Sequence, residues 1–374
     1  MRIKKLLALA VCVVIAVCSL VGCETAIGEY LEIYEQAGIG AKPEKEKVTI
    51  DLYIITELPE NYEDEAVASE HRADLATVKQ NINLHLEENY RTTLNITFCS
   101  AEEYDDLIKS KTSGIVLINS EQLMNELLAK NALADLTNYL ASDEYEFGTL
   151  NVQIAATLLD AAAVDGKLFC IPNNHVVGSY DYIAVNKDIA AKLHYGKNDI
   201  AKINTPEAAQ QFVQEAEKQW SNPNLGMEGE FSADLLVRTF ENVGYGYVDA
   251  SAPANAWEYN VAEYPVVDKA EAYSTAFGIL ASTPNPDRAM EIIYALNTDV
   301  EFRNLLQYGV LNNDYEIIHN DNSDAVNILI KDTTYKMNIL YTGDIFKAYY
   351  VSPLWTEDMA IAGKQQNADS LLAD

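Results

Sequence analysis

Residues 164–190 read VDGKLFCIPNNHVVGSYDYIAVNKDIA, and this stretch decides the fold. Its Asp-Gly pair at 165–166 predicts a turn, and the apolar run Leu168–Ile171 predicts a short strand that ends at the following proline. After a polar bend, Tyr180–Asn186 predicts a second strand that leads into a helix. A single passage of this kind is typical of a chain that crosses from one lobe of a protein to another.

The polar bend between these two strands contains Asn173, Asn174 and His175. In a crossing between lobes, the bend lies at their junction, where small-molecule sites tend to occur. Its amide and imidazole groups can exchange hydrogen bonds with a polar ligand, and Tyr180 and Tyr182 follow closely. We therefore expect these five side chains to contribute to a binding site.

The sequence before this stretch alternates between strand and helix patterns. The strands are predicted at Val48–Thr56, Thr93–Cys99 and Gly114–Asn119, and the helices at Ala73–Tyr90, Glu102–Lys109 and Ser120–Asn131. This order predicts a parallel sheet covered by helices. Because ligands approach the carboxyl ends of the strands in open α/β sheets, Glu57 and Asn119 are candidate site residues.

The first residues have the pattern of an export signal. Basic residues at positions 2, 4 and 5 precede the apolar run Leu6–Val21, and the motif LVGC at 20–23 resembles the lipobox of bacterial lipoproteins. We expect residues 1–22 to be a signal peptide, Cys23 to carry the lipid and residues 23–47 to form a polar tether. An ordinary signal peptide cut elsewhere and a short anchor helix are the alternatives.

The composition is that of a folded, acidic protein. The chain has 374 residues, enough for two lobes with separate cores, and its hydrophobic content of 49% argues against disorder. A formal net charge of −31 repels nucleic acid and anionic lipid headgroups, so neither is an expected partner. Beyond residue 23 the cysteines are Cys99 and Cys170, which lie in apolar runs and are expected as buried thiols. A disulfide between them is the open alternative.

Patterns that carry catalysis or bind cofactors are missing from the sequence. The five histidines are scattered, without a His-Glu-x-x-His pair or metal-ligand spacing, and there is no Gly-x-Ser-x-Gly elbow or phosphate-binding glycine loop. With 57 acidic residues, carboxylate pairs arise by chance. We expect no enzyme activity, no bound metal and no cofactor.

Aromatic residues after the crossing are further candidates for ligand contact. Tyr245, Tyr247, Trp257 and Tyr259 lie in a loop-rich region, and Trp355 opens the last predicted helix, which extends to residue 372. Such rings either pack locally or offer a flat face to a ring-shaped ligand. Both interpretations stay open for the group at 245–259.

Several segments together resemble the extracytoplasmic solute-binding proteins of bacterial ABC importers, of the carbohydrate type called family 1. They include the crossing stretch with its Gly-Lys, Pro and Asn-Lys-Asp positions, and the helix predicted at Pro206–Trp220 with Thr205 as its N-cap. The C-terminal third contributes a return strand at Tyr273–Ile279, a helix capped by Asn285, and the closing segment Met337–Tyr350. The chain departs from the family in its short region Ser221–Val267 and at residues 111–115, where relatives often read Gly-x-x-Pro-Asp.

This resemblance implies a two-lobed α/β fold of the type II periplasmic-binding-protein class, in which each lobe has a central sheet flanked by helices. Lobe one should comprise residues 48–174 and 276–310, and lobe two residues 175–275 and 311–374. It implies that a monomer, anchored through Cys23 on the extracytoplasmic face of the bacterial membrane, captures a sugar or oligosaccharide between the lobes and delivers it to an ABC permease. A diverged surface sensor or adhesion protein, and an extracellular glycan-cleaving enzyme, are the alternatives.

Overall fold

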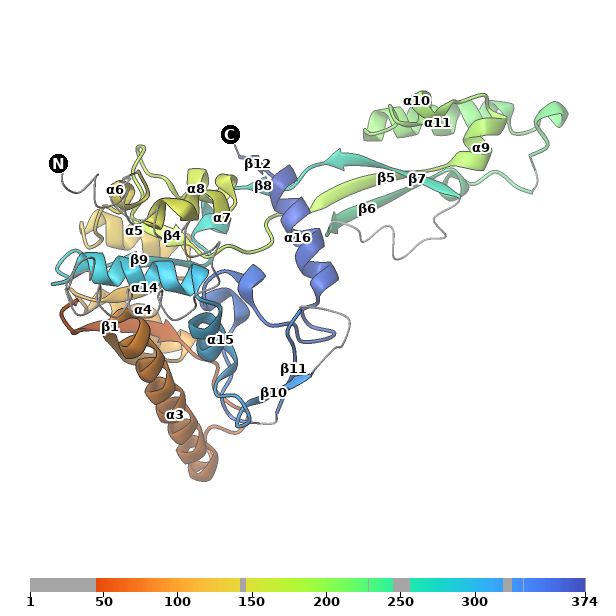
Figure 1. Ribbon diagram of the computed structural model, residues 1–374. Coiled ribbons are helices and arrows are strands. Elements are labelled where there is room, and N and C mark those ends of the chain that lie inside the picture. Colours follow the sequence, from red (N-terminus) through yellow and green to blue (C-terminus); the bar gives the residue numbers. More distant parts are fainter. Residues whose placement is uncertain are drawn as a thin grey trace, which may run out of the picture. The chain divides into compact units, whose positions relative to one another are not determined.

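The computed structural model describes residues 45–141, 146–227, 229–244, 256–318, 325–331 and 333–373 (Figure 1). Residues Val48–Asp374 form one compact unit, which is the subject of the following paragraphs. The expected signal peptide, the lipidation site Cys23 and most of the tether lie outside the described residues, as do Tyr245 and Tyr247.

The largest sheet has five strands in the order β2-β1-β3-β9-β4. The first three strands of the chain, β1, β2 and β3, are parallel, whereas β9 runs antiparallel to both of its neighbours, β3 and β4. The strands are β1 (Val48–Ile55), β2 (Thr92–Cys99), β3 (Ile115–Ile118), β4 (Cys170–Pro172) and β9 (Ala276–Ile279). Strand β9, to which the chain returns after the three-stranded sheet, therefore lies between β3 and β4. Strand β3 is the last of the parallel strands, and β4 is the strand from which the chain crosses to the second sheet.

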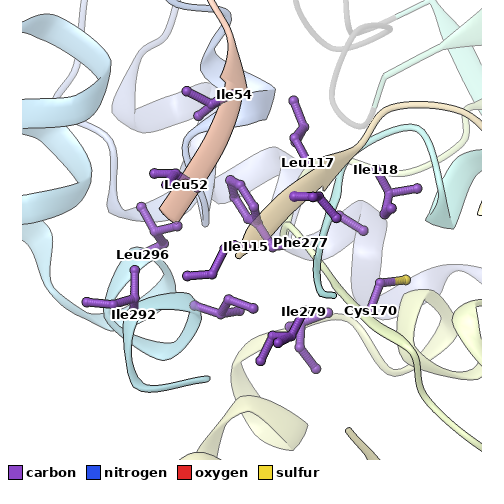
Figure 2. Packing of buried hydrophobic residues seen from close by; sticks show 14 of the residues in the cluster. Leu52, Ile54, Ile115, Leu117, Ile118, Cys170, Phe277, Ile279, Ile292 and Leu296 are labelled. Carbon is purple, nitrogen blue, oxygen red and sulfur yellow. The ribbon is translucent and has the colours of Figure 1, made fainter. Parts of the chain in front are cut away.

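Helices cover this sheet and complete the main hydrophobic core. They are α3 (Glu65–Tyr90), α4 (Ala101–Lys109), α5 (Glu121–Ala129), α6 (Thr137–Ala141), α7 (Leu150–Gln153), α8 (Ala156–Ala162), α13 (Lys269–Ala272), α14 (Pro286–Thr298) and α15 (Val300–Tyr308). Figure 2 shows Leu52 of β1 with Ile292 and Leu296 of α14, and Phe277 of β9 beside Ile115 of β3; all five are buried. A fully buried side chain of this size contributes about 1.5–3 kcal/mol through removal of apolar surface from water.

A second sheet has three strands and its own core. It consists of β5 (Tyr180–Asn186), β6 (Val237–Val243) and β7 (Trp257–Glu263), in the antiparallel order β6-β5-β7. Ile183 and Val185 of β5 pack in a cluster with Phe212, and the helices of this part are α9 (Lys187–Lys192), α10 (Lys197–Ile200) and α11 (Pro206–Gln219). The alternation of side chains along a strand sends Tyr180 and Tyr182 to the opposite face.

The C-terminal segment contributes small elements and one long helix. These are the hairpin β10 (Tyr315–Ile318) and β11 (Asn327–Ile330), the helix α16 (Glu357–Asp369), and the short parallel pair β8 (Val266–Val267) and β12 (Leu371–Leu372). Single 3₁₀ turns lie at Glu146–Thr149, Pro223–Leu225, Ala233–Leu235, Ile339–Tyr341 and Ile345–Lys347. Among the described residues, no helix is both long and apolar enough to cross a bilayer.

The predicted order of strands and helices before the crossing is confirmed, with three strands in parallel. The helix predicted from residue 73 begins at Glu65, where Asp64 caps it by accepting the Ala66 N–H at 2.8 Å. Its first two turns are largely polar, so they carry no apolar stripe that would reveal them in the sequence. Thr205 caps α11 as expected, accepting the Ala208 N–H at 3.2 Å.

Two further boundaries and one helix cap differ from the prediction. Strand β4 includes Pro172, which is possible because β4 is an edge strand and the missing N–H faces no neighbour. Asn285 occupies the N-cap position of α14, but its side chain makes no capping hydrogen bond. The last helix begins at Glu357, capped by Thr356, and ends at Asp369, because the residues beyond it pair with β8 as strand β12.

The two cysteines of the described residues are free thiols; Cys170 is buried as expected, whereas Cys99 is only partly buried. Cys99 lies on β2 and Cys170 on β4, the opposite edges of the five-stranded sheet. At about 4.8 Å per strand, four strand spacings separate them by roughly 19 Å, far more than the 4.4–6.8 Å between the Cα atoms of a disulfide. Burial raises the pKa of Cys99 to about 11 and that of Cys170 to about 12, so both thiols stay protonated.

A substitution at Gly343 tests how closely the C-terminal segment packs against Leu296 of α14. The φ of Gly343 is +97°, and an added Cβ would lie 2.1 Å from the carbonyl oxygen of Leu296. We expect Gly343→Ala to lower the free energy of unfolding by about 3 kcal/mol or more, because backbone strain and a backbone clash add together. Gly166→Ala is the control: its φ is +75° but no atom lies within 4 Å of the added Cβ, so it should cost only about 1 kcal/mol. Urea unfolding of Val48–Asp374 measures both, and equal costs would contradict the close fit.

Candidate functional site

Two adjoining pockets lie at the carboxyl end of β1, where the parallel-sheet rule places ligands. The first, about 540 Å³, is lined by Thr56, Ser100, Glu102 and Tyr341; we call it the polar pocket. The second, about 470 Å³, is lined mainly by apolar and aromatic side chains; we call it the apolar pocket. Glu57 and Asn338 line both, so the two adjoin at these residues and together make up the candidate site.

The end of β1 is fixed to the C-terminal segment by backbone hydrogen bonds. Lys336 O accepts the Glu57 N–H at 3.2 Å and the Thr56 hydroxyl at 3.2 Å. Asn338 follows and caps the 3₁₀ turn Ile339–Tyr341 by accepting the Leu340 N–H at 3.0 Å. Residues 336–341 therefore lie across the strand end and supply one wall of the site.

The N-terminus of α4 supplies the wall of the polar pocket at the end of β2. Ser100 occupies the N-cap position, but its side chain makes no capping hydrogen bond. Helix first turns have backbone N–H groups without intrahelical partners, and Ser100 and Ala101 line the pocket here. With the exposed Glu57 and Glu102 carboxylates and the Tyr341 hydroxyl, the pocket offers both donors and acceptors of hydrogen bonds. Burial, with a smaller contribution from Glu57, raises the pKa of Tyr341, so this phenol remains a donor.

Trp355 forms part of the apolar pocket. Only 9% of its surface is exposed, and its ring packs against Phe346 with centroids 6.0 Å apart. Its backbone is held by a pair of hydrogen bonds with Val351, at 2.7 and 2.8 Å. The indole N–H is buried and has no hydrogen-bond partner among the described residues. An unpaired buried donor is costly, so an acceptor that reached it would be favoured.

The crossing bend is buried and bonded to distant segments of the chain. Asn173 donates its side-chain amide to the Thr275 hydroxyl at 2.9 Å and to Leu340 O at 2.8 Å. Asn174 donates its amide to Gln153 O at 2.8 Å, and its own carbonyl accepts the Ile345 N–H at 3.0 Å. Neither residue lines the polar or the apolar pocket; Asn174 lines another, of about 390 Å³, beside α16.

His175 continues this network toward α13 and α16. Its Nδ1 lies 2.8 Å from Asn173 O and its Nε2 lies 2.9 Å from the Glu271 carboxylate. The His175 carbonyl accepts the Asn367 amide at 2.6 Å, and Asn367 in turn accepts the Val177 N–H at 2.9 Å. With their side chains engaged in this way, Asn173, Asn174 and His175 hold the crossing in place.

The remaining predicted residues that the structure describes lie away from the polar and apolar pockets. Tyr180 and Tyr182 stack at 5.4 Å on one face of the three-stranded sheet, and Tyr180 donates to Asp369 at 2.7 Å. Trp257 is buried beneath the guanidinium of Arg238, which lies 4.5 Å from its ring. Asn119 is partly buried at the end of β3 and accepts the Ser120 hydroxyl at 3.4 Å. Of the predicted residues, Glu57 and Trp355 are brought together in one pocket.

Several site residues were not identified from the sequence as ligand contacts, namely Ser100, Glu102, Asn338 and Tyr341. The first two follow β2, so the rule that selected Glu57 after β1 and Asn119 after β3 could have found them. Asn338 and Tyr341 gave no such signal, because a contact between residues 57 and 336 depends on tertiary structure. No group of His, Cys, Asp or Glu side chains in the described part of the chain is arranged to hold a metal ion.

Comparison with known proteins gives matches at the level of structure. No family model and no curated protein matches the chain. The N-glycan transport solute binding protein NgtS from Streptococcus pneumoniae, in complex with Man1GlcNAc, is 16% identical over 87% of this chain and 84% of that one, with a TM-score of 0.53. Its complex with Man5GlcNAc is 17% identical over 87% and 83%, with a TM-score of 0.51. The chain thus has the α/β fold of two-domain solute-binding proteins, and the fold that the sequence predicted is confirmed.

Asp344, which accepts from the Asn174 amide and from the Phe346 N–H at 2.9 Å, provides a pH test of the buried network. Burial raises its pKa to about 6, against the hydrogen bonds and the nearby Arg303 and Lys347 charges that oppose the rise. The folded protein therefore retains a proton that the unfolded chain loses, so this group's contribution to stability is full below pH 4 and is lost as pH rises through 6.

We expect Asp344→Asn to remove this decrease in the free energy of unfolding between pH 4 and pH 6, which amounts to about 3 kcal/mol at most. Unfolding midpoints of Val48–Asp374, measured from pH 4 to pH 7, give the difference between variant and parent at each pH. Asp165→Asn, at an exposed turn, controls for the loss of one negative charge. If the difference in unfolding midpoint between Asp344→Asn and the parent does not change with pH, the buried carboxyl is not the source of the pH-dependent stability.

Proposed function

We propose that the chain is an extracytoplasmic lipoprotein that captures a sugar or oligosaccharide and delivers it to an ABC permease. The observation that carries this proposal is the site at the carboxyl end of β1. There one cavity is lined by five residues whose side chains carry hydroxyl, carboxylate or amide groups, namely Glu57, Ser100, Glu102, Asn338 and Tyr341. A polyhydroxylated ligand both donates and accepts hydrogen bonds, so a wall that offers both kinds of group suits it.

The comparisons support a binding role on this fold. NgtS, with the same fold, is described in complexes with Man1GlcNAc and Man5GlcNAc. Binding clefts on this kind of scaffold close when lobes move about a hinge. In our proposal, lobe one comprises residues 48–174 and 276–310, lobe two the rest of 48–374, and Asn173, Asn174 and His175 act at the hinge between them. Anchoring through Cys23 and docking on a permease complete the proposal.

A thermal-shift screen of Val48–Asp374 against monosaccharides, oligosaccharides, amino acids and short peptides tests the capture of a sugar. A ligand that binds only the folded state stabilises it by about 2.7 kcal/mol at a hundredfold excess over Kd. We expect a saturable rise in Tm with one class of sugar and no product formed. A flat response to every sugar, or product formation, would contradict the proposal.

The site is tested separately by Glu57→Gln and Asn338→Ala. Each removes a hydrogen-bond partner from the ligand, so we expect the Kd for the sugar found in the screen to rise about tenfold, equivalent to about 1.4 kcal/mol. Glu60→Gln, an exposed residue that lines neither pocket, is the matched control and should leave Kd unchanged. Equal effects of Glu57→Gln and Glu60→Gln, measured by titration calorimetry, would place the site elsewhere.

A further inference from the structure

The two halves of the candidate site differ in the side chains that line them. The polar pocket ends at Ser100, Glu102 and Tyr341, whereas the apolar pocket has Tyr335, Ile339, Val351 and Trp355 in its wall beside the polar Gln307 and Lys336. A purely hydroxylated ligand would leave the apolar part of this wall without apolar contacts. Apolar walls gain free energy by excluding water from apolar groups, so this half selects for a hydrocarbon or aromatic portion.

The rim of the apolar pocket is itself exposed and apolar. Leu354 is 74% exposed and Ile330, at the end of β11, is 43% exposed; both line the pocket. Exposed apolar side chains grouped at the mouth of a cavity mark a binding surface more often than those scattered singly. Leu354 and Ile330 therefore add exposed apolar surface to this pocket.

The apolar pocket adjoins the polar pocket, and this indicates which kind of ligand would cover its exposed apolar rim. Because Glu57 and Asn338 line both pockets, a ligand whose hydroxylated part lies against them reaches the apolar pocket with its next atoms. The ring of Trp355 is packed on Phe346 and only 9% exposed, so its face is not open to stacking by a sugar.

We propose that the ligand is an amphipathic glycoside, in which a hydroxyl-rich head is joined to an apolar substituent that fills the pocket of Trp355, Leu354 and Ile330. This inference rests on the proposed function and narrows its substrate class. The head lies in the polar pocket, the glycosidic oxygen lies near Glu57 and Asn338, and the substituent runs along the apolar wall.

Titration calorimetry of Val48–Asp374 with four probes tests the inference: methyl and octyl β-D-glucoside, and methyl and octyl β-D-maltoside, all below the critical micelle concentration. Each buried methylene strengthens binding about fourfold, so burial of part of the chain predicts that an octyl glycoside binds roughly tenfold to a hundredfold tighter than its methyl partner. 1-Octanol alone should bind more weakly than the octyl glycosides, because it has no head for the polar pocket.

Substitutions in the rim of the apolar pocket test whether the preference for octyl over methyl glycosides arises there. Leu354→Ser and Ile330→Ser should each reduce the ratio of methyl to octyl Kd severalfold while leaving the methyl glycoside Kd unchanged. Leu329→Ser and Ile361→Ser are matched controls: these side chains are 58% and 62% exposed but do not line the pocket, so they should leave the ratio unchanged. Sedimentation of each protein reports whether the surface instead joins two copies of the chain.

The outcomes separate this inference from the proposed function. Equal binding of methyl and octyl glycosides would overturn the inference and leave sugar capture standing. Failure of these glycosides and of every sugar in the screen would overturn both. Binding of 1-octanol as tight as that of the octyl glycosides, or a dimer that Leu354→Ser converts to monomer without any octyl preference, would also overturn it.

Discussion

The arrangement of the chain depends on the need to satisfy the buried polar groups of one short bend. Asn173 and His175 are almost completely buried where the chain leaves the five-stranded sheet, and each unpaired polar group there costs about 1–3 kcal/mol. The Asn173 amide nitrogen and both His175 ring nitrogens have partners, whereas the Asn173 side-chain oxygen has none among the described residues. Their partners come from segments far away in sequence, around Thr275, Leu340 and Asn367. Fixing one bend therefore fixes the positions of the return strand β9, the segment after β11, and α16. The connections between the two sheets are defined by this network rather than by apolar packing alone.

The same organisation places the candidate site. Once the segment at 336–341 is anchored through Leu340, its backbone meets the end of β1, and Lys336 bonds to Thr56 and Glu57. The sheet contributes strand ends and the N-terminus of α4, while the C-terminal segment contributes Asn338, Tyr341 and Trp355. The cavity is therefore formed jointly by the sheet and the C-terminal segment.

Much of the fold was predictable because the periodicity of apolar residues within each short segment indicates a strand or a helix. The alternation of apolar strands and amphipathic helices gave β1, α3, β2, α4, β3 and α5 in the correct order, and Thr205 with Pro206 marked the start of α11. The site was predictable only in part. Glu57 followed from the position of strand ends in α/β sheets, but Asn338 meets it across about 280 residues of chain, and no local pattern records that contact. The sequence predicted that Asn173, Asn174 and His175 contact a ligand, and in the structure their side chains bond to distant segments of the chain. Polar residues in a bend look alike in the sequence whether they bind a ligand or make such internal hydrogen bonds.

The placement of the two thiols has a consequence for how the chain can mature. Cys99 and Cys170 lie on opposite edges of one sheet, and burial keeps both protonated and poorly nucleophilic. The folded unit thus needs no oxidase to reach its native state. An oxidant could join the two thiols only before the sheet forms, and because the sheet holds them apart, such a bridge would have to be reduced before the chain could complete its fold.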